Sequence, residues 1–151
     1  MNSLAVLSLE GASGTRKKSS FYTRSGWEEV QTTFGIEPEE MNYMTMKITT
    51  TDISCLPRHI ESAYCLRHFT NDPRWREMGK TFLVSLTKYC RTDIGYAALS
   101  DVEKKTKQDE MESFFFAETL KYLYLLYAPP ETVDLSKVVF NTEAHPIRRT
   151  W

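Results

Sequence analysis

The chemistry-bearing residues of this 151-residue chain lie mainly in its last third. Glu118 stands within Met111–Tyr127, a run of phenylalanines, tyrosines and leucines. A carboxylate in such surroundings needs a partner, a ligand or water, because burying it alone is costly. A second polar group, Asn141-Thr142-Glu143-Ala144-His145-Pro146, follows a short apolar stretch near the C-terminus. These two segments are therefore the first candidates for a functional site.

The elements around these residues follow from periodicity. Apolar residues recur at helical spacing from Met111 to Tyr127 and face almost every direction, so the sequence predicts a helix over 111–127 that is buried on more than one side. Asp109 and Glu112 have the spacing of a capping box at its start, and Pro129-Pro130 ends it. Val138–Asn141 then reads as a short β-element.

Upstream, two further helices are predicted over 58–70 and 73–91, joined by a short turn at Asp72-Pro73. Trp75, Gly79, Phe82, Leu83 and Leu86 form the apolar stripe of the second helix. A short helix is predicted around Trp27–Val30, and 104–107 reads as a solvated loop. The sequence thus predicts an all-α fold with a short β-hairpin near the C-terminus.

Composition limits the possible functions. Hydrophobic residues make up 41% and charged residues 26% of the chain, as is usual for a globular domain, and a net charge of −1 gives no reason to expect nucleic acid. We expect no transmembrane segment and find no targeting signal. Met1–Ser20 is predicted to be a flexible segment and 21–151 the folded domain. The pairing of the three cysteines, Cys55, Cys65 and Cys90, stays open.

A family resemblance enters at the C-terminal third. The string M-E-S-F-F-x-A-E-T-L-K-Y-L-Y-L-L, followed by V-F-N-T-E-A-H-P, resembles the end of class I α-1,2-mannosidases, glycoside hydrolase family 47. The resemblance implies the C-terminal part of an (α/α)7 barrel and a calcium-dependent inverting enzyme. It also implies that the substrates are high-mannose N-glycans on glycoproteins, trimmed in the endoplasmic reticulum or Golgi. The residues from 21 to 151 would then be a partial glycosidase catalytic domain.

The resemblance assigns roles to individual residues. Thr142 matches the threonine that binds Ca²⁺ through its carbonyl and hydroxyl, and calcium takes six to eight hard oxygens. Glu143, Glu118 and Glu112 match acidic positions around the metal and the sugar. Phe114 matches the aromatic floor of the sugar site, although periodicity alone makes it a core residue.

A further match lies upstream. Gly35-Ile36-Glu37-Pro38-Glu39 resembles the family's G-[LI]-x-P-E segment, which makes Glu39 a candidate catalytic acid of the cleft. The residue pattern alone favours a plainer interpretation. Acidic residues are common at a helix start after proline, because the helix dipole stabilises them there.

One position departs from the family. Its motif L-R-P-E-x-x-E-S reads Cys55-Leu56-Pro57-Arg58-His59-Ile60-Glu61-Ser62 here, so Arg58 stands where the resemblance places the general base. Arginine has no acceptor and stays protonated in proteins, whereas an inverting glycosidase needs two carboxyl groups. The general acid belongs to an earlier part of the barrel. We therefore expect a partial or degenerate family member without activity. The alternatives are a non-catalytic calcium- or mannose-binding relative and a helical-hairpin interaction protein.

Overall fold

The computed structural model describes residues 32–38, 40–42, 45, 47–50, 53 and 58–150. The segment predicted to be flexible, Met1–Ser20, and the helix predicted around Trp27–Val30 lie outside the described residues, as do Glu39 and Cys55. The boundary of the folded domain at residue 21 therefore stays a prediction.

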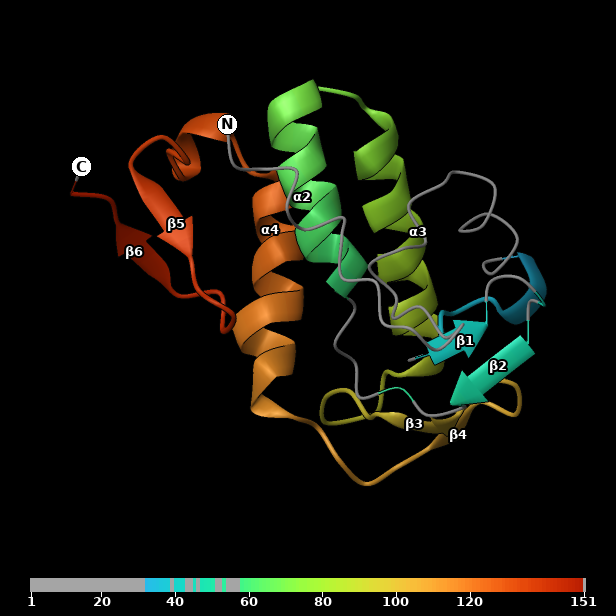
Figure 1. The fold of residues 1–151 in the computed structure, drawn as a ribbon. Coiled ribbons are helices and arrows are strands. Elements are labelled where there is room, and N and C mark those ends of the chain that lie inside the picture. Colours follow the sequence, from blue (N-terminus) through green and yellow to red (C-terminus); the bar gives the residue numbers. More distant parts are fainter. Residues whose placement is uncertain are drawn as a thin grey trace.

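Three helical elements form the main body of the protein (Figure 1). Helix α2 (Arg58–Thr70) contacts α3 (Arg74–Tyr89) and α4 (Lys121–Tyr127), and these two also contact each other. The predicted helix 58–70 is confirmed at both ends, and the predicted helix 73–91 is two residues shorter at its C-terminal end and one at its N-terminal end. Asp72 accepts a hydrogen bond from the Arg74 amide at 2.9 Å, which explains the start of α3.

The long C-terminal helix begins later than predicted. Its first helical residue is Ser113, and Phe115–Leu120 form a π-helical segment, η3, that continues into α4. The predicted capping box is wrong, because the Glu110 carbonyl accepts a hydrogen bond from the Ala98 amide at 2.9 Å. Residues 108–112 are therefore not helical, and Asp109 lies in a bend. The helix ends at Tyr127, before Pro129-Pro130, as predicted, and a short 3-10 helix, η4 (Pro130–Thr132), follows.

Three small antiparallel sheets flank the helices (Figure 1). They pair β1 (Glu40–Asn42) with β2 (Lys47–Thr50), β3 (Leu99–Asp101) with β4 (Thr106–Lys107), and β5 (Val138–Phe140) with β6 (Pro146–Arg148). The predicted C-terminal hairpin is confirmed. The fold is helix-rich, but the prediction of an all-α fold with one hairpin is too narrow, because the structure also contains the β1–β2 and β3–β4 sheets.

The segment 104–107 shows why the β3–β4 sheet was not predicted. It was predicted to be a solvated loop, yet Asp101 Oδ1 accepts the amides of Glu103 and Lys104, at 2.8 and 2.9 Å, and folds the chain back on itself. The backbone at Lys105 takes a positive φ of 59°, and its ammonium donates to the carbonyls of Phe34 and Val102. Local side-chain bonds thus close the β3–β4 turn without any apolar pattern.

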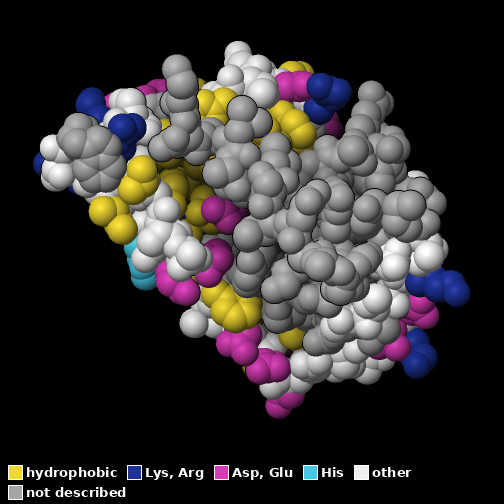
Figure 2. Space-filling model, viewed as in Figure 1, with side chains coloured by type: hydrophobic (Ala, Val, Ile, Leu, Met, Phe, Trp, Pro, Cys, Tyr) yellow, Lys and Arg dark blue, Asp and Glu magenta, His cyan; other side chains and the backbone are white. Residues whose placement is uncertain are grey.

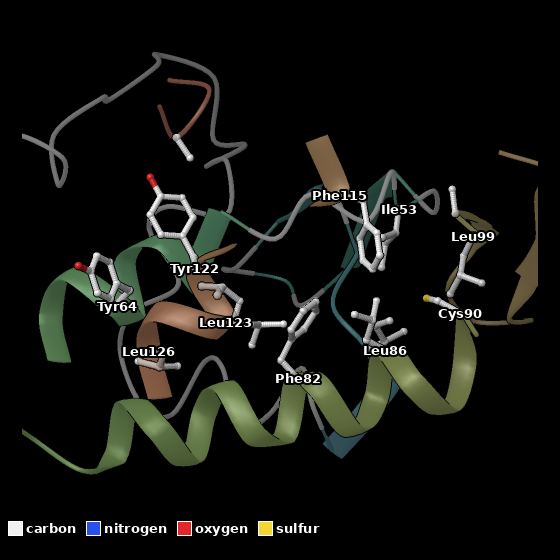
Figure 3. Close-up of a cluster of buried hydrophobic side chains, with 14 of the residues drawn as sticks. Ile53, Tyr64, Phe82, Leu86, Cys90, Leu99, Phe115, Tyr122, Leu123 and Leu126 are labelled. Atoms are coloured by element: carbon white, nitrogen blue, oxygen red, sulfur yellow. The ribbon is translucent and has the colours of Figure 1, made fainter. Parts of the chain in front are cut away.

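The core lies between the helices and the inner ends of the sheets (Figure 3). Figure 3 shows Phe82 and Leu86 of α3 facing Leu123 of α4 and Phe115 of η3. The expectation that the C-terminal helix is buried on more than one side fails for Phe116 and Tyr124, which are 55% and 64% exposed. Leu83 of the predicted α3 stripe is also exposed. No described helix is both long and apolar enough to cross a bilayer.

Candidate functional site

The Asn141–Pro146 motif forms the turn between β5 and β6. Asn141 organises it, because its side-chain Oδ1 accepts the amides of Glu143 at 3.0 Å and His145 at 2.8 Å. Its carbonyl also accepts the Ala144 amide at 3.0 Å. Ala144 adopts a positive φ of 55° and is fully buried. These bonds leave Thr142 and Glu143 exposed at the tip of the turn.

Two contacts fix this turn against the helices. The Lys121 ammonium, at the start of α4, donates to the Ala144 carbonyl at 2.7 Å. Behind the turn, Phe140 packs edge-on against Tyr122 and Tyr64, with ring centroids 5.7 and 6.4 Å apart. The turn is therefore tethered to the junction of η3 and α4, one helical turn beyond Glu118.

The helix at that junction is not regular. Glu118 lies in the π-helical segment η3, and Phe114 is the residue immediately before η3. π-Helical turns are rare and often occur at functional sites. Both side chains are half-buried, so each can pack against the protein while keeping part of its surface accessible. Of the predicted site residues, Glu118 thus lies within the irregular segment and Phe114 directly before it.

Burial and neighbouring acidic groups both affect the Tyr122 phenol. Burial raises the pKa of Tyr122, and the carboxylates of Glu61 and Glu118 act in the same direction. Glu61 comes from α2 and Glu118 from η3, so two helices direct negative charge at one phenol. Figure 2 shows acidic side chains along this edge of the molecule, below the β5–β6 hairpin and beside exposed hydrophobic side chains. Glu61 was not among the predicted site residues, although it belongs to the E-S pair of the L-R-P-E-x-x-E-S motif.

Other acidic and thiol groups of the described residues also have shifted pKa values or are buried. A side-chain hydrogen bond with Glu110, helped by partial desolvation and like charge, raises the pKa of Glu112, which lies before the helix begins. Cys65 and Cys90 are present as thiols, and burial together with Glu61 raises the pKa of Cys65 to about 11. A thiol of this kind is unreactive at neutral pH.

The structure brings the predicted residues together only in part. The turn that carries Thr142 and Glu143 is tethered through Ala144 to Lys121, at the start of α4, and α4 continues the η3 segment that carries Glu118. Phe114 lies at the opposite end of η3 from Lys121. Glu39 lies outside the described residues. Arg58 is the first residue of α2, and its side chain is not described.

The donors at the turn suit a hard cation. Thr142 offers a hydroxyl and a carbonyl, and oxygen donors of this kind are those that calcium prefers. Among the described residues, no three His, Cys, Asp or Glu side chains converge as a metal site. A calcium ion at this turn would be held by Thr142, with water and ligand oxygens completing its shell.

Comparison with known proteins decides the family. A family model described as glycosyl hydrolase family 47 matches residues 14–149. The chain belongs to this family. Membership favours the glycosidase interpretation over a helical-hairpin interaction protein.

Individual relatives agree. Human ER degradation-enhancing alpha-mannosidase-like protein 3 is 40% identical over 126 residues, which are 73% of this chain and 14% of that protein. Human mannosyl-oligosaccharide 1,2-alpha-mannosidase IB is 45% identical over 93 residues, or 60% of this chain and 14% of that enzyme. The alpha-1,2-mannosidase structure from Trichoderma reesei superposes with a TM-score of 0.72 at 29% identity, covering 87% of this chain and 32% of that one. The chain thus spans 14% of the length of these curated relatives.

The Lys121 tether gives a first prediction. We expect Lys121→Met to lower the free energy of unfolding by about 1 to 2 kcal/mol, because it leaves the Ala144 carbonyl without this charged donor. Amide exchange at Ala144 and His145 should also accelerate. Urea unfolding and hydrogen exchange measure both effects, with Lys80→Met, at an exposed position of α3, as the control. Equal behaviour of the two variants would contradict the tether.

Proposed function

We propose that this chain carries the C-terminal part of the catalytic domain of a calcium-dependent, inverting α-1,2-mannosidase of the kind that trims high-mannose N-glycans. The chain itself is proposed to be inactive. The observation that carries the proposal is the 2.7 Å bond between Lys121 and Ala144, which holds the Thr142 turn at the helix bearing Glu118. Family membership and the names of the similar proteins supply the substrate class.

The proposed architecture is an arc of an (α/α)7 barrel. Two observations support it: the superposition covers 32% of the fungal mannosidase, and the outer faces of η3 and α4 expose Phe116 and Tyr124. Exposed aromatic side chains on packed helices are consistent with faces that neighbouring helices would cover. The names of the relatives, which include an ER degradation-enhancing protein, support a place in the secretory pathway.

The proposed roles follow the geometry of the turn. Thr142 would hold calcium through its hydroxyl and carbonyl, and a cation there can orient a sugar diol. Glu118 and Glu143 would bind the sugar and the water molecules around the ion, with Glu61 contributing to the same negative region. Phe114 would pack against the sugar ring, and Glu39 is proposed as a further acidic residue of the active-site cleft.

The alternative, a non-catalytic calcium- or mannose-binding relative, uses the same turn. Arg58 favours it over an active enzyme, because a guanidinium cannot accept a proton from water. A mannosidase catalytic domain needs the family's remaining catalytic carboxyl groups, whereas a non-catalytic calcium- or mannose-binding relative does not. They agree on Thr142 as the metal ligand, which makes calcium binding the direct test.

We predict weak calcium binding that depends on Thr142. One threonine and a few waters do not make a preformed site, so the dissociation constant should be on the order of 0.1–1 mM or weaker. Thr142→Val should weaken it further by removing the hydroxyl. Isothermal titration calorimetry measures this, with Thr132→Val in η4 as the matched control. Submicromolar binding that survives Thr142→Val would refute the assignment.

A further inference from the structure

A carboxylate and an imidazole meet inside the protein, away from the Thr142 turn. Glu37 Oε2 and His59 Nδ1 lie 2.7 Å apart. His59 is 1% exposed and Glu37 8% exposed, so water reaches neither group freely. The two atoms are at ion-pair distance, although their alignment falls short of a hydrogen bond. At this separation the contact is attractive only when a proton lies between the two atoms, on Nδ1 or on Oε2, because two lone pairs would repel.

The imidazole is held rigidly from its other side. His59 is the second residue of α2, and its ring stands edge-on against Phe82 of α3, with centroids 4.9 Å apart and planes at 83°. Nε2 is buried and has no hydrogen-bond acceptor within the described part of the chain. A ring enclosed in this way cannot serve solvent or substrate as a base. It can act as a fixed anchor for the carboxylate.

The segment that carries Glu37 is anchored at its beginning as well. Lys105 donates to the Phe34 carbonyl. The backbone at Gly35 takes a φ of +71°, and a Cβ there would come within 2.8 Å of the Tyr89 hydroxyl oxygen. Ile36 is fully buried in the core. Residues 34–36 are thus fixed to α3 and to the β3–β4 turn. The Glu37 side chain fixes residue 37 to α2.

We propose that Glu37 and His59 form a latch that joins the Gly35–Pro38 segment to the first turn of α2. The pair is a positioning device. Residue 39 follows the latched segment and residue 58 precedes His59, and these are the two positions where the family resemblance places active-site acids. The latch rests on the geometry alone, while its consequence for the cleft rests on the proposed function.

The energetics predict how the latch responds to substitution. Removing Glu37 leaves the buried imidazole without its counter-charge, and removing His59 takes the nearest cationic neighbour in the pair from a buried carboxylate; both changes are destabilising. Replacing both partners by apolar residues removes both desolvation penalties and is often neutral. Glu37→Leu and His59→Leu should therefore each release the segment, and the double variant should largely restore it.

Isoleucine methyl groups report this directly. The experiment uses the full chain with labelled isoleucine methyls and a soluble paramagnetic probe that broadens exposed signals in NMR spectra. In the unchanged protein the Ile36 and Ile60 methyls, both fully buried, should be protected, and Ile94, fully exposed, should be broadened. In either single variant the Ile36 signal should broaden toward the Ile94 level while Ile60 stays protected. In the double variant Ile36 should return close to the Ile60 level.

A matched control separates the latch from general loss of stability. Leu86→Ala removes buried core volume without touching either latch residue, so it should leave the ratio of Ile36 to Ile60 broadening unchanged. If a leucine variant does not fold, Glu37→Gln and His59→Gln replace it, with a smaller but selective broadening of Ile36 expected. Protected Ile36 in both single variants, or equal exposure in single and double variants, would overturn the latch. None of these readouts depends on calcium or mannose, so they stand apart from a failure of the proposed function.

Discussion

The purified 151-residue chain is expected to release no mannose from an α-1,2-linked oligosaccharide, with or without calcium. Two independent losses lead to this result. Arg58 occupies the position that the resemblance gives to the general base, and a fixed cation there would also repel the oxocarbenium-like transition state. The resemblance places the general acid in an earlier part of the barrel, which these residues do not include. Each missing carboxyl group removes assistance worth roughly 10²–10⁴ in rate.

It follows that Arg58→Glu alone should not give activity. The same change in a fusion to the preceding part of a similar mannosidase should give measurable turnover, while the fusion with Arg58 should not. Release of mannose, measured by chromatography of the products, distinguishes these variants. Arg74→Glu, an exposed arginine at the start of α3, is the matched control for the charge change. Turnover by the unmodified chain would contradict the inactive interpretation, and an inactive, folded Arg58→Glu fusion would show that 58 is not the base position.

The helices were the most predictable part of the fold. Helix 58–70 was predicted at both ends because Pro57 and the Asn71-Asp72-Pro73 turn limit it, and both signals are local. The start of the C-terminal helix was mispredicted, since Asp109 and Glu112 satisfy the capping pattern but Glu110 pairs with Ala98 instead. A backbone hydrogen bond between residues distant in sequence overrode the local signal.

The candidate site was predictable only where a motif specified it. The turn 141–146 came from the resemblance and forms a compact hairpin tip. Lys121, which tethers that turn, sits in an apolar helix where nothing in the sequence distinguishes it from a surface lysine. The Glu37–His59 contact joins residues of different elements, and a single sequence gives no periodic signal for such a pair. Likewise, no residue pattern in the sequence indicates that Phe115–Leu120 form a π-helical segment.

The packing of α3 on α4 depends on a glycine. A Cβ at Gly79 would lie 2.3 Å from Leu126 Cδ2 and 3.3 Å from the Tyr127 hydroxyl oxygen. The helices cannot easily separate there. Arg76 Nε donates to the Leu126 carbonyl at 3.1 Å, and the Tyr127 hydroxyl donates to the Arg76 carbonyl at 2.6 Å. Leu126 itself is 1% exposed, so its side chain has little room to move.

Gly79→Ala is therefore expected to lower the free energy of unfolding by about 2 kcal/mol, although alanine in a helix interior is favoured over glycine by up to about 1 kcal/mol. The clash outweighs the propensity, because inserting a methyl group into a packed interface costs typically about 1–3 kcal/mol. Gly95→Ala is the control for an added methyl group without a clash, since its Cβ would meet only the Met111 side chain, at an ordinary 3.5 and 3.8 Å. Urea unfolding of both variants measures the difference.

A second background separates the clash from other effects of the new methyl group. Leu126→Val removes the Cδ atoms that the alanine would strike, at a cost of its own of about 1 kcal/mol. In that background Gly79→Ala should cost little or nothing, because the helix propensity of alanine is then opposed only by the 3.3 Å approach to the Tyr127 hydroxyl oxygen. Most of the destabilisation should thus disappear with the change at residue 126. Equal destabilisation in both backgrounds would mean that α3 and α4 do not meet at Gly79 and Leu126.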